Sequence, residues 1–233
     1  METKIIGTIG PASRNYSILK EMISSGLDIA RINTKYGSIP EYLKTIRNIK
    51  KIGKCKILFD IKGLNLIDWL KAQKFDYLAV SFAETKDQIL HIRKLFSPRK
   101  IKIISKIETK QGIHNIEELL KVSDGIMIAR GDLGKNISFE KVPIVQKLII
   151  KKCNKKKKIV ITATEMLLSM VSSKSPLKSE VSDVANAILD GSDALMLSEE
   201  TTIGKNPVLV VKVMRKIILE TQLKNKDLKD VIN

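Results

Sequence analysis

Aromatic side chains and cysteines are scarce in this sequence. Phe, Trp and Tyr make up 4% of its 233 residues, too few to indicate the stacking platforms of proteins that bind single-stranded nucleic acid. Cys55 and Cys153 form no CxxC pair, and isolated cysteines of this kind favour a reducing cytoplasm. Apolar runs stay far below membrane-spanning length, and no signal or transit segment is evident. We therefore expect a cytoplasmic protein with no membrane partner.

Acidic residues are also outnumbered, with 25 Asp and Glu against 42 Lys and Arg, for a formal net charge of +17. Such a charge is compatible with nucleic-acid binding. The basic residues, however, are mostly lysines spread over predicted helix surfaces, as in 46–54 and 151–158. We interpret them as a solvated surface that attracts small anions, and we expect no specific nucleic-acid partner.

Strand-like and helix-like segments alternate from one end of the chain to the other. The predicted strands are Lys4–Gly10, Asp28–Asn33, Lys56–Ile61, Tyr77–Phe82, Ile101–Glu108, Gly125–Asp132, Ile159–Glu165 and Ala194–Ser198. The predicted helices are Tyr16–Ser25, Ile39–Ile52, Asn65–Gln73, Lys86–Leu95, Ile113–Lys121, Ser138–Asn154, Ser179–Leu189 and Pro207–Leu223. Eight such units predict an α/β protein with a single (β/α)8 TIM barrel over residues 1–233. An open doubly wound sheet is the alternative, but no Gly-rich dinucleotide fingerprint follows the first strand.

Two segments, 105–108 and 129–134, carry the chemistry. Side chains alternate along a strand, so Lys106 and Glu108 point the same way, and Asp132 is expected to end the next strand. A lysine and two carboxylates at the carboxyl end of a parallel sheet predict a Mg²⁺ site for an anionic oxygen substrate. Other predicted strand ends are also polar, with Arg31, Asn33, Asp60, Lys62, Ser81, Arg130, Thr162, Thr164, Ser198 and Glu200.

Each of these polar residues, taken alone, is as well explained by a strand-end cap or an ion pair as by function. The whole ring is not, because charges collected at one mouth of a barrel add no stability. Several ordered motifs then resemble the pyruvate kinase family along nearly the whole chain. They are 3–13, 30–33, 104–108, 123–134, 162–170, 180–191 and 195–201.

The resemblance implies an enzyme of glycolysis, a kinase that transfers a phosphoryl group between phosphoenolpyruvate and ADP, giving pyruvate and ATP. It implies that Glu108 and Asp132 bind the catalytic Mg²⁺ or Mn²⁺. It assigns Lys106 to the transferring phosphoryl group and the developing enolate charge, which such reactions need stabilised. Arg31 is expected to grip the phosphate, for which a guanidinium fork is suited.

Further roles follow from the same resemblance. Backbone N–H groups of Gly131 and Asp132 are expected to cradle the substrate carboxylate, helped by a helix N-terminus. Thr164 is expected to contact the substrate near the enolate carbon. Asn33 and Asp60 match two of the four potassium ligands of the family.

The sequence also departs from the family. The lid domain that the family inserts after the third strand is expected to be absent near 62–68, because Asp60–Ile67 runs almost directly into the fourth unit. The chain ends just after the eighth predicted helix, so the C-terminal regulatory domain is expected to be absent too. Ile61 stands at the position of a potassium-ligand threonine, and Ile67 at that of an ATP-binding arginine.

Lys35 and Tyr36 mark another departure, at the positions of a potassium-ligand serine and of a histidine near the nucleotide. By the two-residue period, Arg31, Asn33 and Lys35 share one strand face. We predict that the Lys35 ammonium takes the place of potassium, so that K⁺ is not required. A lysine that points into solvent is the alternative.

Three functions stay open at this point. The first is a minimal pyruvate kinase, slow and unregulated. The second is Mg²⁺-dependent enolate chemistry on pyruvate or oxaloacetate, as decarboxylase or tautomerase, which the loss of nucleotide contacts favours. The third is a pseudoenzyme or one subunit of a split protein, against which the intact Glu108 and Asp132 motifs argue. The motifs favour the first, and the oligomeric state stays open.

Overall fold

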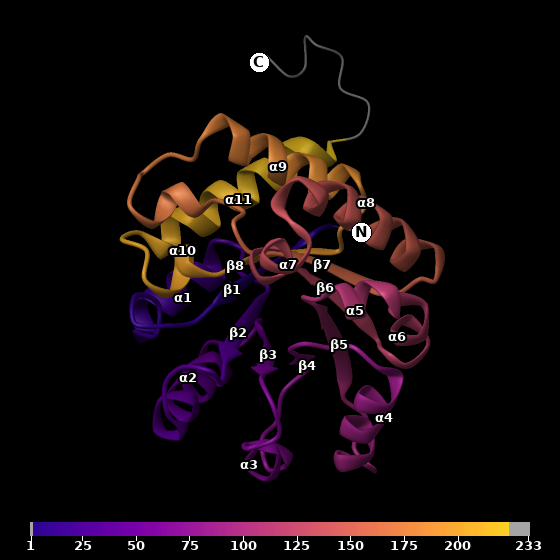
Figure 1. The fold of residues 1–233 in the computed structure, drawn as a ribbon. Helices are drawn as coiled ribbons and strands as arrows, with labels where there is room; N and C mark the ends of the chain where they lie inside the picture. The colour runs from indigo at the N-terminus through magenta and orange to yellow at the C-terminus, as the bar shows by residue number, and fades with distance from the viewer. Residues whose placement is uncertain (1, 224–233) are drawn as a thin grey trace.

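Eight parallel strands close into a barrel in the computed structural model, which describes residues 2–223 (Figure 1). The strands pair in chain order, and the last pairs with the first. They are β1 (Lys4–Thr8), β2 (Ile29–Asn33), β3 (Lys56–Ile61), β4 (Tyr77–Val80), β5 (Lys102–Ile107), β6 (Gly125–Ala129), β7 (Ile159–Ala163) and β8 (Ala194–Leu197). The predicted (β/α)8 barrel is confirmed, and the open sheet is excluded. Of the predicted domain range, Met1 and 224–233 lie outside the described residues.

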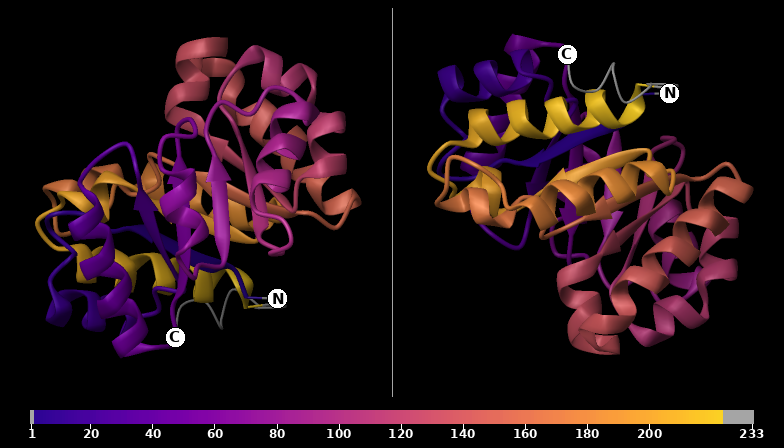
Figure 2. Two further views of the ribbon diagram at one scale, coloured as in Figure 1. Left: turned by 90° about the horizontal axis from the view of Figure 1, so that it is seen from below. Right: turned by 90° about the horizontal axis from the view of Figure 1, so that it is seen from above.

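Helices follow the strands and cover the outside of the barrel; α9 and α11 lie side by side (Figure 2). The helices are α1 (Tyr16–Ser24), α2 (Ile39–Ile52), α3 (Ile67–Lys71), α4 (Lys86–Leu95), α5 (Lys110–His114), α6 (Ile116–Val122), α7 (Arg130–Ile137), α8 (Val142–Lys155), α9 (Lys178–Leu189), α10 (Glu199–Thr202) and α11 (Pro207–Gln222). Two short 3-10 turns are η1 (Phe139–Lys141) and η2 (Leu168–Val171). Within residues 2–223, no helix has the length and apolarity that crossing a membrane requires.

The side chains of the strands form two apolar cores. One fills the inside of the barrel with Ile6, Ile29, Leu58, Tyr77, Ala79, Ile104, Met127, Ile161, Ala163, Ala194 and Met196. The larger one lies between the strands and the helices and includes Phe59, Ile103, Ile126 and Leu195. Both faces of each strand are covered, which explains why the strands read as continuous apolar runs in the sequence, as is typical of a parallel sheet. The barrel interior is packed, so polar chemistry is confined to its ends.

The structure corrects three predicted elements. The strand predicted over Gly125–Asp132 ends at Ala129, and α7 begins at Arg130. Asp132 is therefore the third residue of a helix, not the end of a strand. The helix predicted over 113–121 is two helices that meet at Asn115, whose side chain donates to Glu84 O at 2.7 Å. The helix predicted over 138–154 begins with η1 before α8.

The loop between β2 and α2 lies at the carboxyl end of the barrel and is tied down by α2. The Ser38 N–H donates to Glu41 Oε2 at 2.9 Å, which caps the first turn. The Tyr42 hydroxyl, on the same helix, donates to Tyr36 O at 2.6 Å. Gly53 then ends the helix with a φ of +74°, where a side chain would be strained. This segment carries Lys35 and Tyr36 to the rim of the mouth.

Candidate active site

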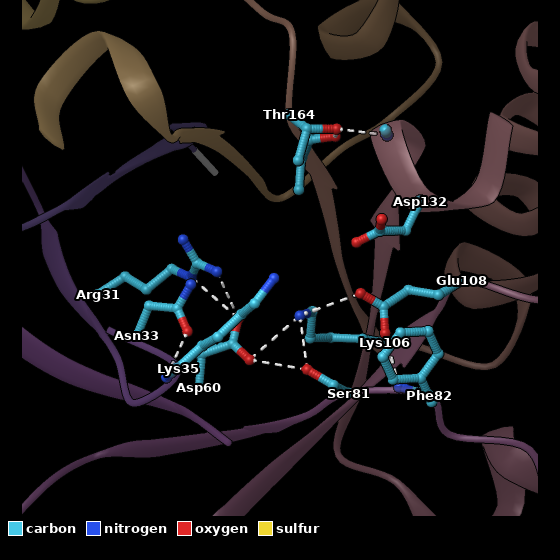
Figure 3. Close-up of polar contacts among 12 residues, drawn as sticks. Arg31, Asn33, Lys35, Asp60, Ser81, Phe82, Lys106, Glu108, Asp132 and Thr164 are labelled. Carbon is cyan, nitrogen blue, oxygen red and sulfur yellow. Dashed lines mark hydrogen bonds and ion pairs between the residues drawn. The ribbon is translucent and has the colours of Figure 1, made fainter. Parts of the chain in front are cut away.

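A cavity of about 640 Å³ lies at the carboxyl ends of the strands. Residues from all eight strand–helix units line it, and Figure 3 shows those from β2 to the loop after β7. Of the predicted site residues, those that line it are Arg31, Asn33, Lys35, Lys106, Glu108, Asp132 and Thr164. Two others do not line the cavity and are held against those that do, Asp60 and Gly131.

Asp60 is the centre of a buried ion network. Its side chain is enclosed, with 1% of the residue exposed. Oδ2 accepts from Arg31 Nε at 2.9 Å, and Oδ1 accepts from Lys106 Nζ at 3.1 Å. The Ser81 hydroxyl donates to Oδ1 at 3.2 Å. Burial alone would raise the pKa of Asp60, but the Arg31 guanidinium and the Lys106 ammonium outweigh it and lower the pKa below its ordinary value.

Lys106 has a protein acceptor for each of its three donors. Besides Asp60, its ammonium lies 3.1 Å from Glu108 Oε1 and donates to Ser81 Oγ at 2.8 Å. The expectation that Lys106 and Glu108 point the same way is confirmed by this ion pair. Glu108 Oε2 accepts from the Phe82 N–H at 2.6 Å. Burial raises the pKa of Glu108, and the neighbouring ammonium only partly offsets this.

Arg31 is fixed on both sides of its guanidinium fork. Nη2 lies 2.8 Å from Asp60 Oδ2, and Nη1 donates to Thr8 Oγ1 at 2.8 Å. The Thr8 hydroxyl in turn donates to Leu197 O at 2.9 Å. Four strands, β1, β2, β3 and β8, thus determine where Arg31 faces the cavity.

Asp132 differs from these buried groups. It lies in the first turn of α7 with half of its side chain exposed, and its carboxylate pairs with Lys135 at 3.1 Å. Figure 3 shows the Asp132 carboxylate above that of Glu108, on the same side of the site and opposite Arg31. Within residues 2–223 no cluster of three or more His, Cys, Asp or Glu could hold a metal ion. The two carboxylates nevertheless fit Mg²⁺, which commonly uses one or two carboxylates and takes its other ligands from water and substrate phosphates.

Gly131 and Thr164 are brought together from α7 and the loop after β7. The Gly131 N–H donates to Thr164 Oγ1 at 2.8 Å, and that hydroxyl donates to Ala163 O at 2.6 Å. The Thr164 side chain therefore acts as a cap for the N-terminus of α7, whose N-cap residue Ala129 supplies no side-chain bond. Thr164 and Glu165 both have positive φ, +72° and +54°.

Asn33 is the last residue of β2, and Lys35 follows two residues later. Asn33 Oδ1 accepts from the Lys35 N–H at 3.1 Å. β2 ends at Asn33, so the strand alternation does not extend to Lys35, which lies in the following turn. The Lys35 ammonium lies 5.2 Å from the centre of the Tyr36 ring, and within the described residues no ion pair joins it to a carboxylate.

Two parts of the site were not assigned a role from the sequence. Ser81 was recognised as a polar strand end, but its bond to Lys106 was not expected. The pairing of Arg130 with Asp183 at 2.7 Å joins positions 53 residues apart. No local pattern in the sequence signals that contact, because it depends on how α9 packs against α7.

The fold and the mouth together define a (β/α)8-barrel protein whose carboxyl-end cavity is lined by charged side chains of both signs. A model of the pyruvate kinase barrel domain matches residues 1–67 and 62–211. This chain belongs to the pyruvate kinase family.

Individual relatives match over much of this chain. Pyruvate kinase of Geobacillus stearothermophilus is 43% identical over 206 residues, which cover 87% of this chain and 33% of that protein. Pyruvate kinase of Thermococcus litoralis is 32% identical over 331 residues, covering 95% and 70%. The potato pyruvate kinase named a cytosolic isozyme is 41% identical over 160 residues, covering 68% and 31%. The chain thus spans about a third of the Geobacillus relative.

Proposed function

We propose that this chain catalyses Mg²⁺- or Mn²⁺-dependent phosphoryl transfer between phosphoenolpyruvate and ADP, giving pyruvate and ATP. The observation that carries the proposal is the set of charges at the barrel mouth, where Arg31 and Lys106 share one cavity with Glu108 and Asp132. Membership of the pyruvate kinase family supports it, as do relatives that bear that name.

Arg31 and Lys106 would bind the phosphate of phosphoenolpyruvate. Asp60 already holds both cations in place, so substrate binding orders few further side chains. The bond between phosphorus and the enol oxygen breaks as an ADP phosphate oxygen bonds to phosphorus. Lys106 would stabilise the negative charge that develops on the phosphoryl and enolate oxygens. The enolate carbon then takes up a proton and becomes the methyl group of pyruvate.

The substrate carboxylate would lie at the N-terminus of α7, near the backbone N–H groups of Gly131 and Asp132. Because the Gly131 N–H donates to Thr164 Oγ1, the carboxylate and this hydroxyl would compete for one donor or share it. Thr164 would therefore stand next to the bound substrate, near the enolate carbon. Glu108 and Asp132 would hold the divalent cation, which when bound supplies electrostatic stabilisation of the phosphoryl oxygens.

We also propose that this chain lacks the lid domain of its family. β3 ends at Ile61 and α3 begins at Ile67, so 62–66 make the whole connection. The family match divides within this connection, into 1–67 and 62–211. The alignment with the Thermococcus litoralis relative runs over 331 residues, more than the 233 of this chain, and so includes a long gap in this chain. Without a lid, water reaches the site, and hydrolysis competes with transfer.

The same short connection favours a second candidate function. A mouth that nothing closes over a nucleotide could still bind a 2-oxo acid at Lys106, Glu108 and Asp132. Enolisation of pyruvate or decarboxylation of oxaloacetate needs the same stabilisation of enolate charge and no ADP.

One experiment separates these functions. The purified protein with Mg²⁺, phosphoenolpyruvate and ADP is followed by phosphorus NMR for ATP, and pyruvate in D₂O is followed by proton NMR for methyl exchange. We expect ATP formation that is lost in Lys106→Met and kept in Lys102→Met, since Lys102 lies exposed at the opposite end of the same strand. Exchange or oxaloacetate decarboxylation without ATP would instead establish the second function. Neither activity, with no Mg²⁺ binding, would contradict both and indicate a pseudoenzyme or a subunit of a split protein.

A cytoplasmic location is part of the proposal. Cys55 and Cys153 are both free, as in a reducing compartment. Burial raises the pKa of each thiol to about 12, so neither is a reactive nucleophile. The cytosolic potato relative supports the same location.

A further inference from the structure

Arg130, the first residue of α7, has its guanidinium bonded on every side while 9% of the residue is exposed. Nε and Nη2 donate to Thr164 O at 3.1 and 2.7 Å, and Nη2 also donates to Glu165 O at 2.9 Å. Nη1 donates to both carboxylate oxygens of Asp183, at 2.9 and 2.7 Å. A single side chain therefore joins α7, the loop after β7, and α9.

The loop that Arg130 holds is one that the backbone does not favour. Thr164 and Glu165 follow one another with φ of +72° and +54°. The left-handed region is rarely populated by residues other than glycine, and least by β-branched ones such as threonine. Such a conformation persists only where the surroundings determine it. The two carbonyls of this strained pair are the groups that the Arg130 guanidinium binds.

The same turn of chain also fixes the other side of the Thr164 hydroxyl. Gly131, the residue after Arg130, donates its N–H to Thr164 Oγ1 at 2.8 Å. The Arg130 side chain thus binds the backbone carbonyl of Thr164, while the Gly131 N–H binds the side-chain hydroxyl of the same threonine. Asp183 binds the guanidinium from the far side, so the three contacts form one connected set.

We propose that Arg130 is a positioning residue for the reaction put forward above, with Asp183 as its orienting partner. Arg130 does not line the cavity and so does not bind substrate. Its role is to place Thr164 Oγ1 and the Gly131 N–H at the N-terminus of α7. The expected effect on catalysis rests on the proposed function. The placement of Thr164 and Gly131 by Arg130 rests on the geometry alone. Lysine cannot replace it, because one ammonium cannot bind two carbonyls and a bidentate carboxylate in the geometry of a planar fork.

The test compares Arg130→Lys with a matched variant, Arg93→Lys. Arg93 also pairs with an aspartate, Asp124, at 2.7 Å and donates to a carbonyl, Val122 O, at 2.9 Å. Its pair lies next to Ile101 and Ile103, before and at the start of β5, and thus at the amino end of the barrel. Both variants keep the charge and break an arginine–aspartate pair, and the Arg93 side chain is the more exposed, at 38% against 9% for Arg130.

Hydrogen exchange of the Gly131 amide, followed by NMR, is the readout that needs no turnover. We expect Arg130→Lys to lower its protection at least about tenfold and to lower kcat by about 100-fold, the cost of a misplacement near 1 Å. The KM for ADP should stay within about twofold, since no ADP contact is removed. Arg93→Lys should leave the Gly131 protection and kcat unchanged.

Asp183→Asn provides a second variant in case Arg130→Lys fails to fold, as its thermal transition will show. It keeps Arg130 and should move Gly131 protection and kcat in the same direction by a smaller factor. Unchanged Gly131 protection in the folded variants overturns the proposal, as does an equal loss in Arg93→Lys. If the wild-type protein transfers no phosphate, the proposed function fails, whereas the exchange measurement still decides the role of Arg130.

Discussion

The two sides of the barrel mouth are built differently. On the side of β2, β3 and β5, the charges of Arg31, Asp60 and Lys106 are buried and bonded to one another at 2.8–3.1 Å. On the rim, Asp132 is half exposed with an exposed lysine as partner, and Lys35 rests on an exposed aromatic ring. One side is thus fixed by internal bonds without any ligand, while the side chains of the other are held only by solvent-exposed contacts.

This difference separates the cost of a change to stability from its cost to function. A buried charge that loses its partner leaves an uncompensated charge in a low dielectric, which is expensive. A rim charge that loses its partner is solvated by water. Substitutions on the buried side should therefore lower the free energy of unfolding more than substitutions on the rim, which should alter binding and leave the fold intact.

The largest effect is expected from Asp60→Asn. It leaves Arg31 and Lys106 as neighbouring buried cations without their shared carboxylate, so the free energy of unfolding should fall by about 3–5 kcal/mol, measured by urea denaturation. Asp28→Asn is the matched control, since Asp28 also binds two cations, Arg215 and Lys4, but with 24% of its side chain exposed. Its cost should be smaller. A loss below about 1 kcal/mol in Asp60→Asn would contradict the view of a tightly coupled network.

Asp132→Asn should have little effect on stability and a large effect on metal binding. We expect the free energy of unfolding to change by less than about 0.5 kcal/mol, as for an exposed substitution. The affinity for Mn²⁺, measured by electron paramagnetic resonance, should fall by about 10- to 100-fold. Asp68→Asn serves as control because Asp68 also forms an i,i+3 pair with a lysine, Lys71, and does not line the cavity. Equal Mn²⁺ binding by the wild type and Asp132→Asn would remove Asp132 from the metal site.

The acid limb of stability should also report on the buried side. The pKa of Asp60 is lowered in the folded protein from an ordinary value of 3.8. The ionised carboxylate therefore stabilises the folded state at pH above 3.8, and that contribution is lost as the pH falls through the lowered pKa. The difference in unfolding free energy between the wild type and Asp60→Asn should be constant near neutral pH and shrink below pH 3.8. A difference that does not change down to pH 2 would show that the pKa of Asp60 is the same in the folded and unfolded protein, and would contradict the lowered pKa.

The smallest effect on stability is expected from Lys35→Ala, within about 0.5 kcal/mol. The informative measurement is the monovalent-cation dependence of activity. If the Lys35 ammonium takes the place of potassium, the wild type works equally well in K⁺ and Na⁺, and Lys35→Ala gains a requirement for K⁺. Strong stimulation of the wild type by K⁺ over Na⁺ would refute this role. Lys62→Ala, which removes another lysine of the same cavity, is the control.

Much of the fold was predictable because periodicity and capping act locally. β3, α2 and α4 begin and end at the predicted residues, where apolar runs stop at polar or turn-forming residues. The strand predicted as far as Asp132 failed for a non-local reason. α7 begins at Arg130 because its first turn is capped by Thr164 and anchored on Asp183, residues that are distant in the sequence.

The site was predictable to the level of which residues share the mouth, and no further. Strand ends of a parallel barrel must meet, so Arg31, Lys106 and Glu108 could be placed together from the sequence. The individual hydrogen bonds and ion pairs among these side chains could not be deduced from the sequence. The saturation of Lys106 by Asp60, Glu108 and Ser81 depends on side-chain packing across three strands, and the resting place of Lys35 on Tyr36 depends on a turn conformation that no periodicity describes.

The pairing of β1 with β8 means that the barrel can close only late in synthesis. On the ribosome, β1 is made first and its neighbour β8 last, so one edge of β1 stays unpaired until residues 194–197 have been synthesised. Such an open edge is a template for pairing with other chains, and closure over so long a loop is slow. Thr8, which orients Arg31, needs the Leu197 carbonyl for its own hydroxyl. The position of Arg31 at the mouth is thus among the last parts of the molecule to be fixed, and a nascent chain interrupted before β8 has the charged side chains of the mouth without their final arrangement.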